Sequence, residues 1–220
     1  MGDGTRPVAV KKQRKRRKLQ TPSDDVRNRI LDAAAELVAE GGFPALRMDD
    51  LARRAGIAVG TFYLYFEGKD DLFVQLVIGY TDRLLERFHE ADLQDGTVTE
   101  RLARRFDRYL DFVDENRAGF LYFRDSGAVD TTGGRLSAWA LKVHAADTQP
   151  LLEEGMATGE IREQDAELLA HAVVGLLQHI VGVWLDDPDS MSRDRIRRFL
   201  DGFIAFGMQP RSRTAGDGRR

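Results

Sequence analysis

Apolar residues recur at helical spacing along most of this chain, and the clearest pattern lies between residues 48 and 72. Apolar side chains share one helical face before Gly56, and two aromatic side chains stand at i, i+4 spacing after it. These residues are Leu51, Ala52 and Ala55 before the glycine, and Phe62 and Phe66 after it. A glycine between two helices supplies the positive φ that a tight turn requires. The stretch therefore predicts two short helices about a turn, followed by the start of a third helix.

Helical periodicity also covers the chain on both sides of this stretch. It predicts helices near residues 23–40, 69–91, 97–116, 136–155, 165–184 and 196–204. Thr97 and Glu100 have the spacing of a capping box, and Pro150 is expected to kink its helix. The helix over 165–184 is apolar nearly all round, so we expect it to be buried on every side. The predicted fold class is all-α, with about nine helices.

The composition is that of a soluble helical protein. Of the 220 residues, 42% are hydrophobic, which is enough for a sizeable core. The absence of cysteine excludes disulfides, thiolate nucleophiles and cysteine-bound metals. No apolar run approaches the ~18 residues of a membrane span, and the basic N-terminus lacks the apolar segment of a secretory signal. We therefore expect a cytoplasmic protein without a membrane partner, a metal or a cofactor.

The stretch Ala55–Phe66, AGIAVGTFYLYF, with Lys69 three residues beyond it, resembles the helix-turn-helix of the TetR family of bacterial repressors. The resemblance is specific over roughly residues 24–76. It implies a three-helix DNA-binding domain over residues 23–70, with residues 58–65 as the recognition helix. It also implies a helical ligand-binding and dimerisation domain over residues 71–210, and residues 211–220 are expected to form a flexible tail.

Positive charge is concentrated in the half of the chain that carries this motif. Residues 1–70 hold 14 Lys and Arg against 10 Asp and Glu, a net charge of +4, whereas residues 71–220 hold 19 against 26, a net charge of −7. A run of seven positive charges in eight residues, KKQRKRRK, predicts a disordered basic arm over residues 1–22. We expect Lys15, Arg16 and Arg17 in this arm to contact the minor groove or flanking phosphates of DNA. A solvated tail and a nuclear localisation signal are the alternatives.

We expect the main DNA contacts to come from the recognition helix and from the two residues that open its neighbouring helices. These residues are Arg47, Val59, Gly60, Thr61, Tyr63, Leu64, Tyr65 and Lys69. Arg47 stands where the family usually has a Ser or Thr helix cap, and Val59 and Leu64 stand where polar or basic residues are common. The reading face therefore offers no Arg, Asn or Gln for bidentate base contacts. Affinity is expected to depend on phosphate contacts, and specificity on thymine methyl groups and DNA shape. In the alternative reading, Val59 and Leu64 are buried against the domain.

Aromatic side chains from consecutive helices of the second domain resemble the lining of the family's apolar ligand pocket. They are Phe106, Tyr109, Phe112, Phe120, Tyr122, Phe123 and Trp139, and His179 is the expected polar member. Taken singly, each is also an ordinary core residue. The nearby arginines, which are Arg101, Arg104, Arg105 and Arg108, are expected mostly to face solvent. The four histidines show no spacing typical of a metal site.

The resemblance implies a homodimer, paired through the last two helices, that binds a palindromic double-stranded DNA operator. It also implies release by a small hydrophobic or amphipathic inducer. In the alternative to this homodimer, the last two helices pack only within the core of their own chain. The alternative function is a helical enzyme or a metal-dependent small-molecule binder with a basic tail. Against an enzyme, the sequence has no nucleophile-elbow motif, no phosphate-binding loop and no cysteine.

Overall fold

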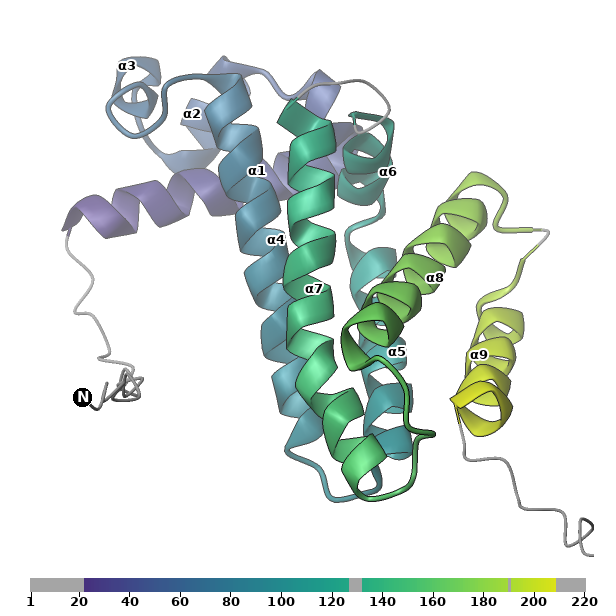
Figure 1. Cartoon of the computed structure of the whole chain (residues 1–220). Coiled ribbons are helices and arrows are strands. Elements are labelled where there is room, and N and C mark those ends of the chain that lie inside the picture. Colours follow the sequence, from purple (N-terminus) through teal and green to yellow (C-terminus); the bar gives the residue numbers. More distant parts are fainter. Residues whose placement is uncertain (1–21, 127–131, 190, 209–220) are drawn as a thin grey trace, which may run out of the picture.

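The computed structural model describes residues 22–126, 132–189 and 191–208, and all the regular structure within these ranges is helical (Figure 1). The helices are α1 (Pro22–Ala45), α2 (Met48–Ala55), α3 (Val59–Phe62), α4 (Lys69–Asp92), α5 (Val98–Glu115), α6 (Arg117–Ser126), α7 (Thr132–Ala157), α8 (Ala166–Asp186) and α9 (Arg193–Gly202), and a π-helical segment (Phe203–Met208) follows. The predicted all-α class is confirmed. The basic arm with Lys15, Arg16 and Arg17 lies outside the described residues, as does the tail over 211–220.

Local sequence signals explain several helix boundaries. Gly42 adopts a φ of 77° and breaks α1 three residues before its end. The capping box of α5 is confirmed, because the Thr97 hydroxyl accepts a hydrogen bond from the amide of Glu100 at 3.2 Å. The Glu100 carboxylate accepts one from the amide of Thr97 at 2.9 Å. Helix α7 continues through Pro150 to Ala157 without the break that an interior proline often causes.

The helices enclose two hydrophobic cores that meet along α4. The head core belongs to α1, α2, α3 and the first turns of α4, and the body core belongs to α4, α5, α7, α8 and α9. Tyr80 of α4 packs against both cores. With 24 residues, α4 is about 36 Å long. It runs beside α7 down the body, while α1 crosses its upper end (Figure 1). The head is thus joined to the body by a continuous helix.

Helix α8 is only partly covered within one chain, so the prediction that it is buried on every side is wrong for a single copy. One face packs into the body core through Val173, Leu177 and Val181. On its other faces, Leu168 is 66% exposed and Val183 is 38% exposed. By length and composition, α8 is also the one described helix that could cross a membrane, a property shared by core helices of soluble proteins.

Candidate functional site

The turn between α2 and α3 has the predicted conformation. Gly56 adopts φ 67° and ψ 41°, in the left-handed region that favours glycine. The amide of Ile57 then donates to the carbonyl of Ala52 at 2.9 Å and closes the end of α2. Phe62 and Phe66 are buried and stack at 5.3 Å between ring centroids. These two rings anchor α3 to the head core, so the opposite side of α3 is presented outward.

The recognition helix is shorter than predicted. Only residues 59–62 are α-helical, and Ala58 caps the helix without a side-chain hydrogen bond. The chain then tightens into i→i+3 hydrogen bonds, from the amide of Leu64 to Thr61 at 3.1 Å and from the amide of Tyr65 to Phe62 at 3.0 Å. Residues 58–65 therefore form one compact helical turn followed by a tighter turn.

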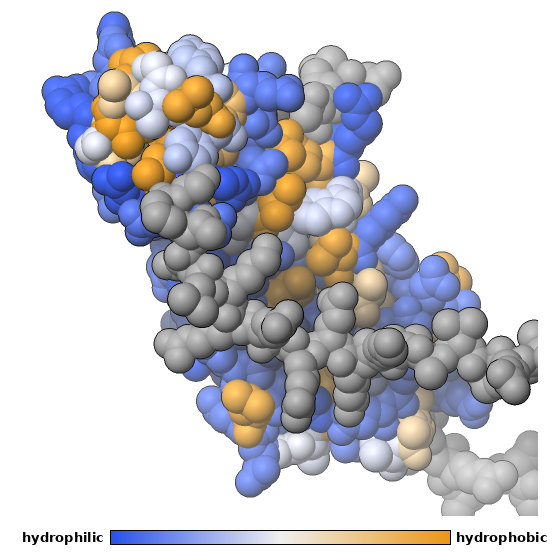
Figure 2. Space-filling model, turned by 90° about the vertical axis from the view of Figure 1, so that its left-hand side faces the viewer, coloured by the Kyte–Doolittle hydropathy of each residue, from blue (hydrophilic) through white to orange (hydrophobic). Residues whose placement is uncertain are grey.

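The outward side of α3 is apolar and open. Leu64 is 81% exposed, Tyr63 is 57% exposed and Val59 is 36% exposed, so the alternative in which Val59 and Leu64 are buried is wrong. A side chain added at Gly60 would meet no atom within 4 Å of its Cβ. Thr61 and Tyr65 are half-buried beside this face. Figure 2 shows apolar side chains gathered at the upper end of the molecule, which carries α2 and α3.

Two basic residues flank this face in different ways. Arg47 is exposed at the start of α2 and makes no side-chain cap, so its guanidinium is presented to solvent. The Lys69 ammonium turns back into the head, where it donates to the carbonyls of Pro44 at 3.3 Å and Leu46 at 3.0 Å. It also lies 5.0 Å from the centroid of the Phe43 ring. Lys69 therefore braces the loop before α2. Two of its three ammonium N–H groups are used in this brace, so only the third is left for the predicted phosphate contact.

A second brace holds α2 against α1. The Arg54 guanidinium lies 3.0 Å from the Glu36 carboxylate and 2.9 Å from the Glu40 carboxylate. The hydrogen bond from Arg54 lowers the pKa of the Glu40 carboxyl below its ordinary value. Arg29 of α1 also donates to the carbonyl of Ala55 at 3.2 Å, at the end of α2. These contacts fix the orientation of the turn that carries α3.

Two apolar cavities lie in the body and at its junction with the head. The body cavity, of about 80 Å³, lies among α4, α5, α6, α7 and α8 and is lined by the predicted residues Phe106, Tyr109 and Phe120. The junction cavity, of about 60 Å³, lies beside α1 and is lined by Phe112, Phe120 and Tyr122.

Two predicted pocket residues line neither cavity. Trp139 is 38% exposed, and His179 is exposed on α8, so both are corrections to the predicted lining. The side chain of Phe123 lies outside the described residues.

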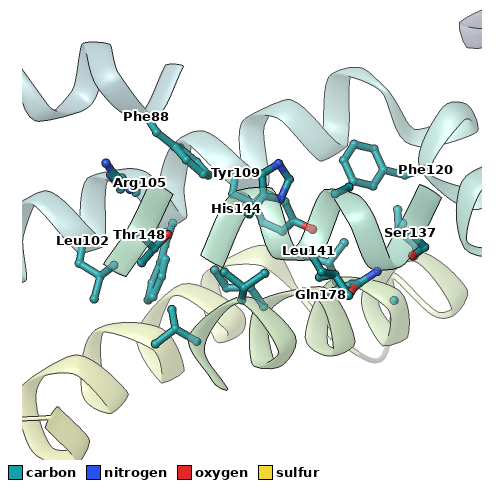
Figure 3. Close-up of a pocket in the computed structure, with 18 residues that line it drawn as sticks. Phe88, Leu102, Arg105, Tyr109, Phe120, Ser137, Leu141, His144, Thr148 and Gln178 are labelled. Atoms are coloured by element: carbon teal, nitrogen blue, oxygen red, sulfur yellow. The ribbon is translucent and has the colours of Figure 1, made fainter. Parts of the chain in front are cut away.

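The polar residues of the body cavity were not predicted. In Figure 3, Arg105 and Thr148 lie toward one end of the pocket, Ser137 and Gln178 toward the other, and His144 between them. The spacing of apolar and polar residues does not identify these side chains as cavity residues, because each lies on a helix face that also carries apolar residues.

Arg105 is buried, so the expectation that it faces solvent is wrong. It is 5% exposed, and its guanidinium lies 2.5 Å from the Asp92 carboxylate and 2.9 Å from the Asp147 carboxylate. It also lies 5.4 Å from the centroid of the Phe88 ring. Two carboxylates from α4 and α7 thus neutralise the arginine of α5, and this ion-pair network ties the three helices together at one end of the cavity.

His144 has a buried ring nitrogen without a partner. Its Nε2 atom makes no hydrogen bond to any described residue. Burial lowers the pKa of His144 to about 4, against the opposing attraction of Asp147, so the ring is neutral at pH 7. Burial also raises the pKa of the Tyr109 hydroxyl well above its ordinary value, so Tyr109 stays protonated. The cavity therefore offers neutral polar groups within an apolar lining.

The sequence matches two protein families, one over each part of this structure. Residues 30–76 match the family described as bacterial regulatory proteins, tetR family. Residues 98–207 match the tetracyclin repressor-like C-terminal domain, which covers half of the chain. The chain belongs to the TetR family. It is therefore a DNA-binding, ligand-responsive transcriptional regulator, with α2 and α3 as its helix-turn-helix.

Relatives within the TetR family include a regulator of fatty acid metabolism and a transcriptional activator. The fatty acid metabolism regulator protein of Bacillus subtilis is 28% identical over 159 residues, which cover 71% of this chain and 81% of that protein. The transcriptional activator FasR of Mycolicibacterium smegmatis is 22% identical over 191 residues, which cover 87% of this chain and 85% of that protein. The crystal structure of FadR from Bacillus subtilis in complex with stearoyl-CoA shares the fold, with a TM-score of 0.69 and 24% identity over 82% of this chain and 98% of that one.

Proposed function

We propose that this TetR-family regulator is a cytoplasmic repressor that binds a palindromic operator as a homodimer and is released by a long, mainly apolar ligand. The observation that carries the proposal is the exposed apolar face of α3. A side chain such as Leu64, 81% exposed at the tip of a rigidly anchored turn, has no packing role in the single chain. Its exposure is explained if the face is covered by DNA.

The reading face meets DNA mainly through shape and methyl contacts. Val59 and Leu64 present branched apolar groups that fit thymine methyl groups in the major groove. Gly60 leaves room for the backbone to approach the groove wall. Arg47 and the basic arm supply phosphate contacts, which add affinity without reading sequence. The operator preference is therefore expected to depend on thymine positions and on DNA shape.

The partner surface is the uncovered side of α8 and α9. Leu168, Val183 and Phe199 are 66%, 38% and 52% exposed in one chain. Exposed large apolar side chains on both of the last two helices are typical of a homodimer interface. In a homodimer, α8 and α9 pair with α8 and α9 of the second chain and cover these side chains. The resulting four-helix interface holds the two DNA-binding heads at a fixed distance. The family's preference for dimers supports this assignment.

The ligand is hydrophobic or amphipathic because both cavities have mostly apolar walls. The related FadR structure contains stearoyl-CoA, which supports a long acyl chain as the apolar part. We infer that the ligand favours an arrangement of the body in which the two heads no longer match the operator spacing.

This function is tested by measuring, with fluorescence anisotropy, how tightly the protein binds overlapping DNA duplexes from the region upstream of its own gene. The protein is expected to bind one duplex at low salt, and stearoyl-CoA is expected to release it while coenzyme A alone does not. Failure to bind any neighbouring promoter at low salt contradicts the proposed repressor. Binding that persists at saturating stearoyl-CoA contradicts the acyl ligand and leaves DNA binding intact.

A further inference from the structure

The two cavities lie back to back. Phe120, Ala140 and His144 line both of them. Ala140 ends at its methyl group, so the wall between the cavities consists mainly of the Phe120 and His144 side chains. Side chains turn between rotamers far more readily than helices move. Joining the body cavity to the junction cavity therefore requires the Phe120 or His144 side chain to rotate.

Each cavity alone is too small for a drug-sized ligand. Pockets for such ligands usually enclose roughly 300–1,000 Å³. The body cavity encloses about 80 Å³ and the junction cavity about 60 Å³. Even joined, the two cavities fall short of this range, so a ligand with a long apolar part must extend through the shared wall and must also push lining side chains apart.

The shared wall also contains the one histidine ring nitrogen of the described residues that is buried without a partner. An unpaired buried polar atom costs free energy that a ligand can restore by supplying a partner. Nε2 of neutral His144 can pair with an uncharged oxygen, either a hydroxyl or a carbonyl. Of the other polar residues of the body cavity, Arg105, Thr148, Ser137 and Gln178 lie toward its ends, and Tyr109 lies beside His144 (Figure 3).

We propose that the two cavities are two limbs of one ligand site, and that the ligand carries an oxygen between its two apolar parts that hydrogen-bonds to Nε2 of His144. This deepens the proposed function, because it names the chemistry of the ligand within the same site. One apolar part lies in the body cavity, and the other lies in the junction cavity against Phe43 of α1. The Lys69 ammonium lies on the Phe43 ring, so this second part of the ligand would contact the ring that supports the Lys69 brace of the loop before α2.

Filling each cavity separately tests whether one ligand uses both limbs. Val77 lines only the junction cavity and Val174 lines only the body cavity, so Val77→Phe and Val174→Phe are a matched pair. The probes are stearic acid and its 3-, 10- and 12-hydroxy derivatives, titrated calorimetrically below their micellar concentrations. Each variant is expected to weaken the best-binding probe about 15-fold, the effect of displacing about two methylene groups. If either variant leaves the affinity of that probe within twofold of wild type, the two-limbed site is excluded.

The folding of these variants is checked by thermal unfolding, and Val77→Leu and Val174→Leu replace any variant that does not fold. The smaller side chains are expected to weaken binding about 4-fold. Absence of binding by wild type to every probe overturns the proposal. A DNA-binding measurement on the same wild-type sample then shows whether the proposed repressor function fails with it.

His144→Leu tests the hydrogen bond. In wild type, at least one hydroxystearic acid is expected to bind about 5-fold more tightly than stearic acid, as one added hydrogen bond predicts. In the variant, that preference is expected to disappear while stearic acid still binds. Loss of packing alone would weaken both probes equally. A preference that survives in the variant, or that is missing in wild type, overturns the assignment of Nε2.

Discussion

The neutral, buried His144 makes the stability of this protein depend on pH in a defined direction. Burial lowers the pKa of His144 in the folded protein to about 4, whereas the ordinary value is 6.5. Between these values the unfolded chain binds a proton that the folded chain does not. Because the unfolded state gains the proton, the free energy of unfolding falls as the pH drops from about 6.5 to about 4. The contribution of His144 is fully present above pH 6.5.

The size of the effect follows from the shift. Lowering of the pKa from 6.5 to about 4, at about 1.4 kcal/mol for each pH unit, corresponds to a loss of about 3 kcal/mol between pH 7 and pH 4. That is a large share of the ~5–15 kcal/mol by which native domains are stable. His144→Leu removes the titrating group, so its unfolding free energy is expected to fall about 3 kcal/mol less than that of wild type over this range.

Urea unfolding at fixed protein concentration, followed by circular dichroism from pH 4 to pH 7, measures this difference. His171→Leu is the matched control, because it removes an exposed histidine of α8 that lies beside α7 and away from Val183 of the proposed partner surface. Other carboxylates titrate in the same range, but they are common to all three proteins. Parallel curves for wild type and His144→Leu would refute the account of His144 as a neutral buried ring.

Three further predictions concern the head, the arm and the partner surface. Lys69→Met removes two hydrogen bonds to the loop before α2, so amide exchange in α2 is expected to speed up roughly tenfold; unchanged exchange contradicts the brace. Deletion of residues 1–20 is expected to flatten the slope of log operator affinity against log salt, and an unchanged slope means that the arm makes no phosphate contacts. Phe199→Asp places a charge on an exposed apolar face, and sedimentation is expected to show a monomer; an intact dimer would locate the interface elsewhere.

Local signals made the head predictable from the sequence. The turn depended on one glycine, Gly56, and the anchoring of α3 on two phenylalanines four residues apart, Phe62 and Phe66. The start of α5 depended on a four-residue capping pattern. Each signal acts between residues close in the chain, so its structural outcome can be read from spacing alone. The length of α3 was overestimated, because the chain changes to i→i+3 hydrogen bonds after Phe62 and no spacing in the sequence marks that change.

Tertiary contacts decided the features that the sequence did not reveal. Arg105 looked like one of four solvent-facing arginines, but its partners Asp92 and Asp147 are 13 and 42 residues away. The Lys69 ammonium points at carbonyls 23 and 25 residues earlier. His144 was one of four histidines without distinguishing spacing, and its burial results from the convergence of several helices. Such residues are recognised only when the helices are assembled.

If the open side of α3 is pressed against DNA, a large side chain at Gly60 must weaken operator binding, and Gly60→Leu measures this effect. A side chain at Gly60 or at Gly79 of α4 would meet nothing within 4 Å of its Cβ, so both Gly60→Leu and the control Gly79→Leu are expected to fold as stably as wild type. Anisotropy with the preferred upstream duplex is expected to show at least a tenfold loss of affinity for Gly60→Leu and less than a twofold change for Gly79→Leu. A folded Gly60→Leu protein that binds this duplex as tightly as wild type would contradict the account.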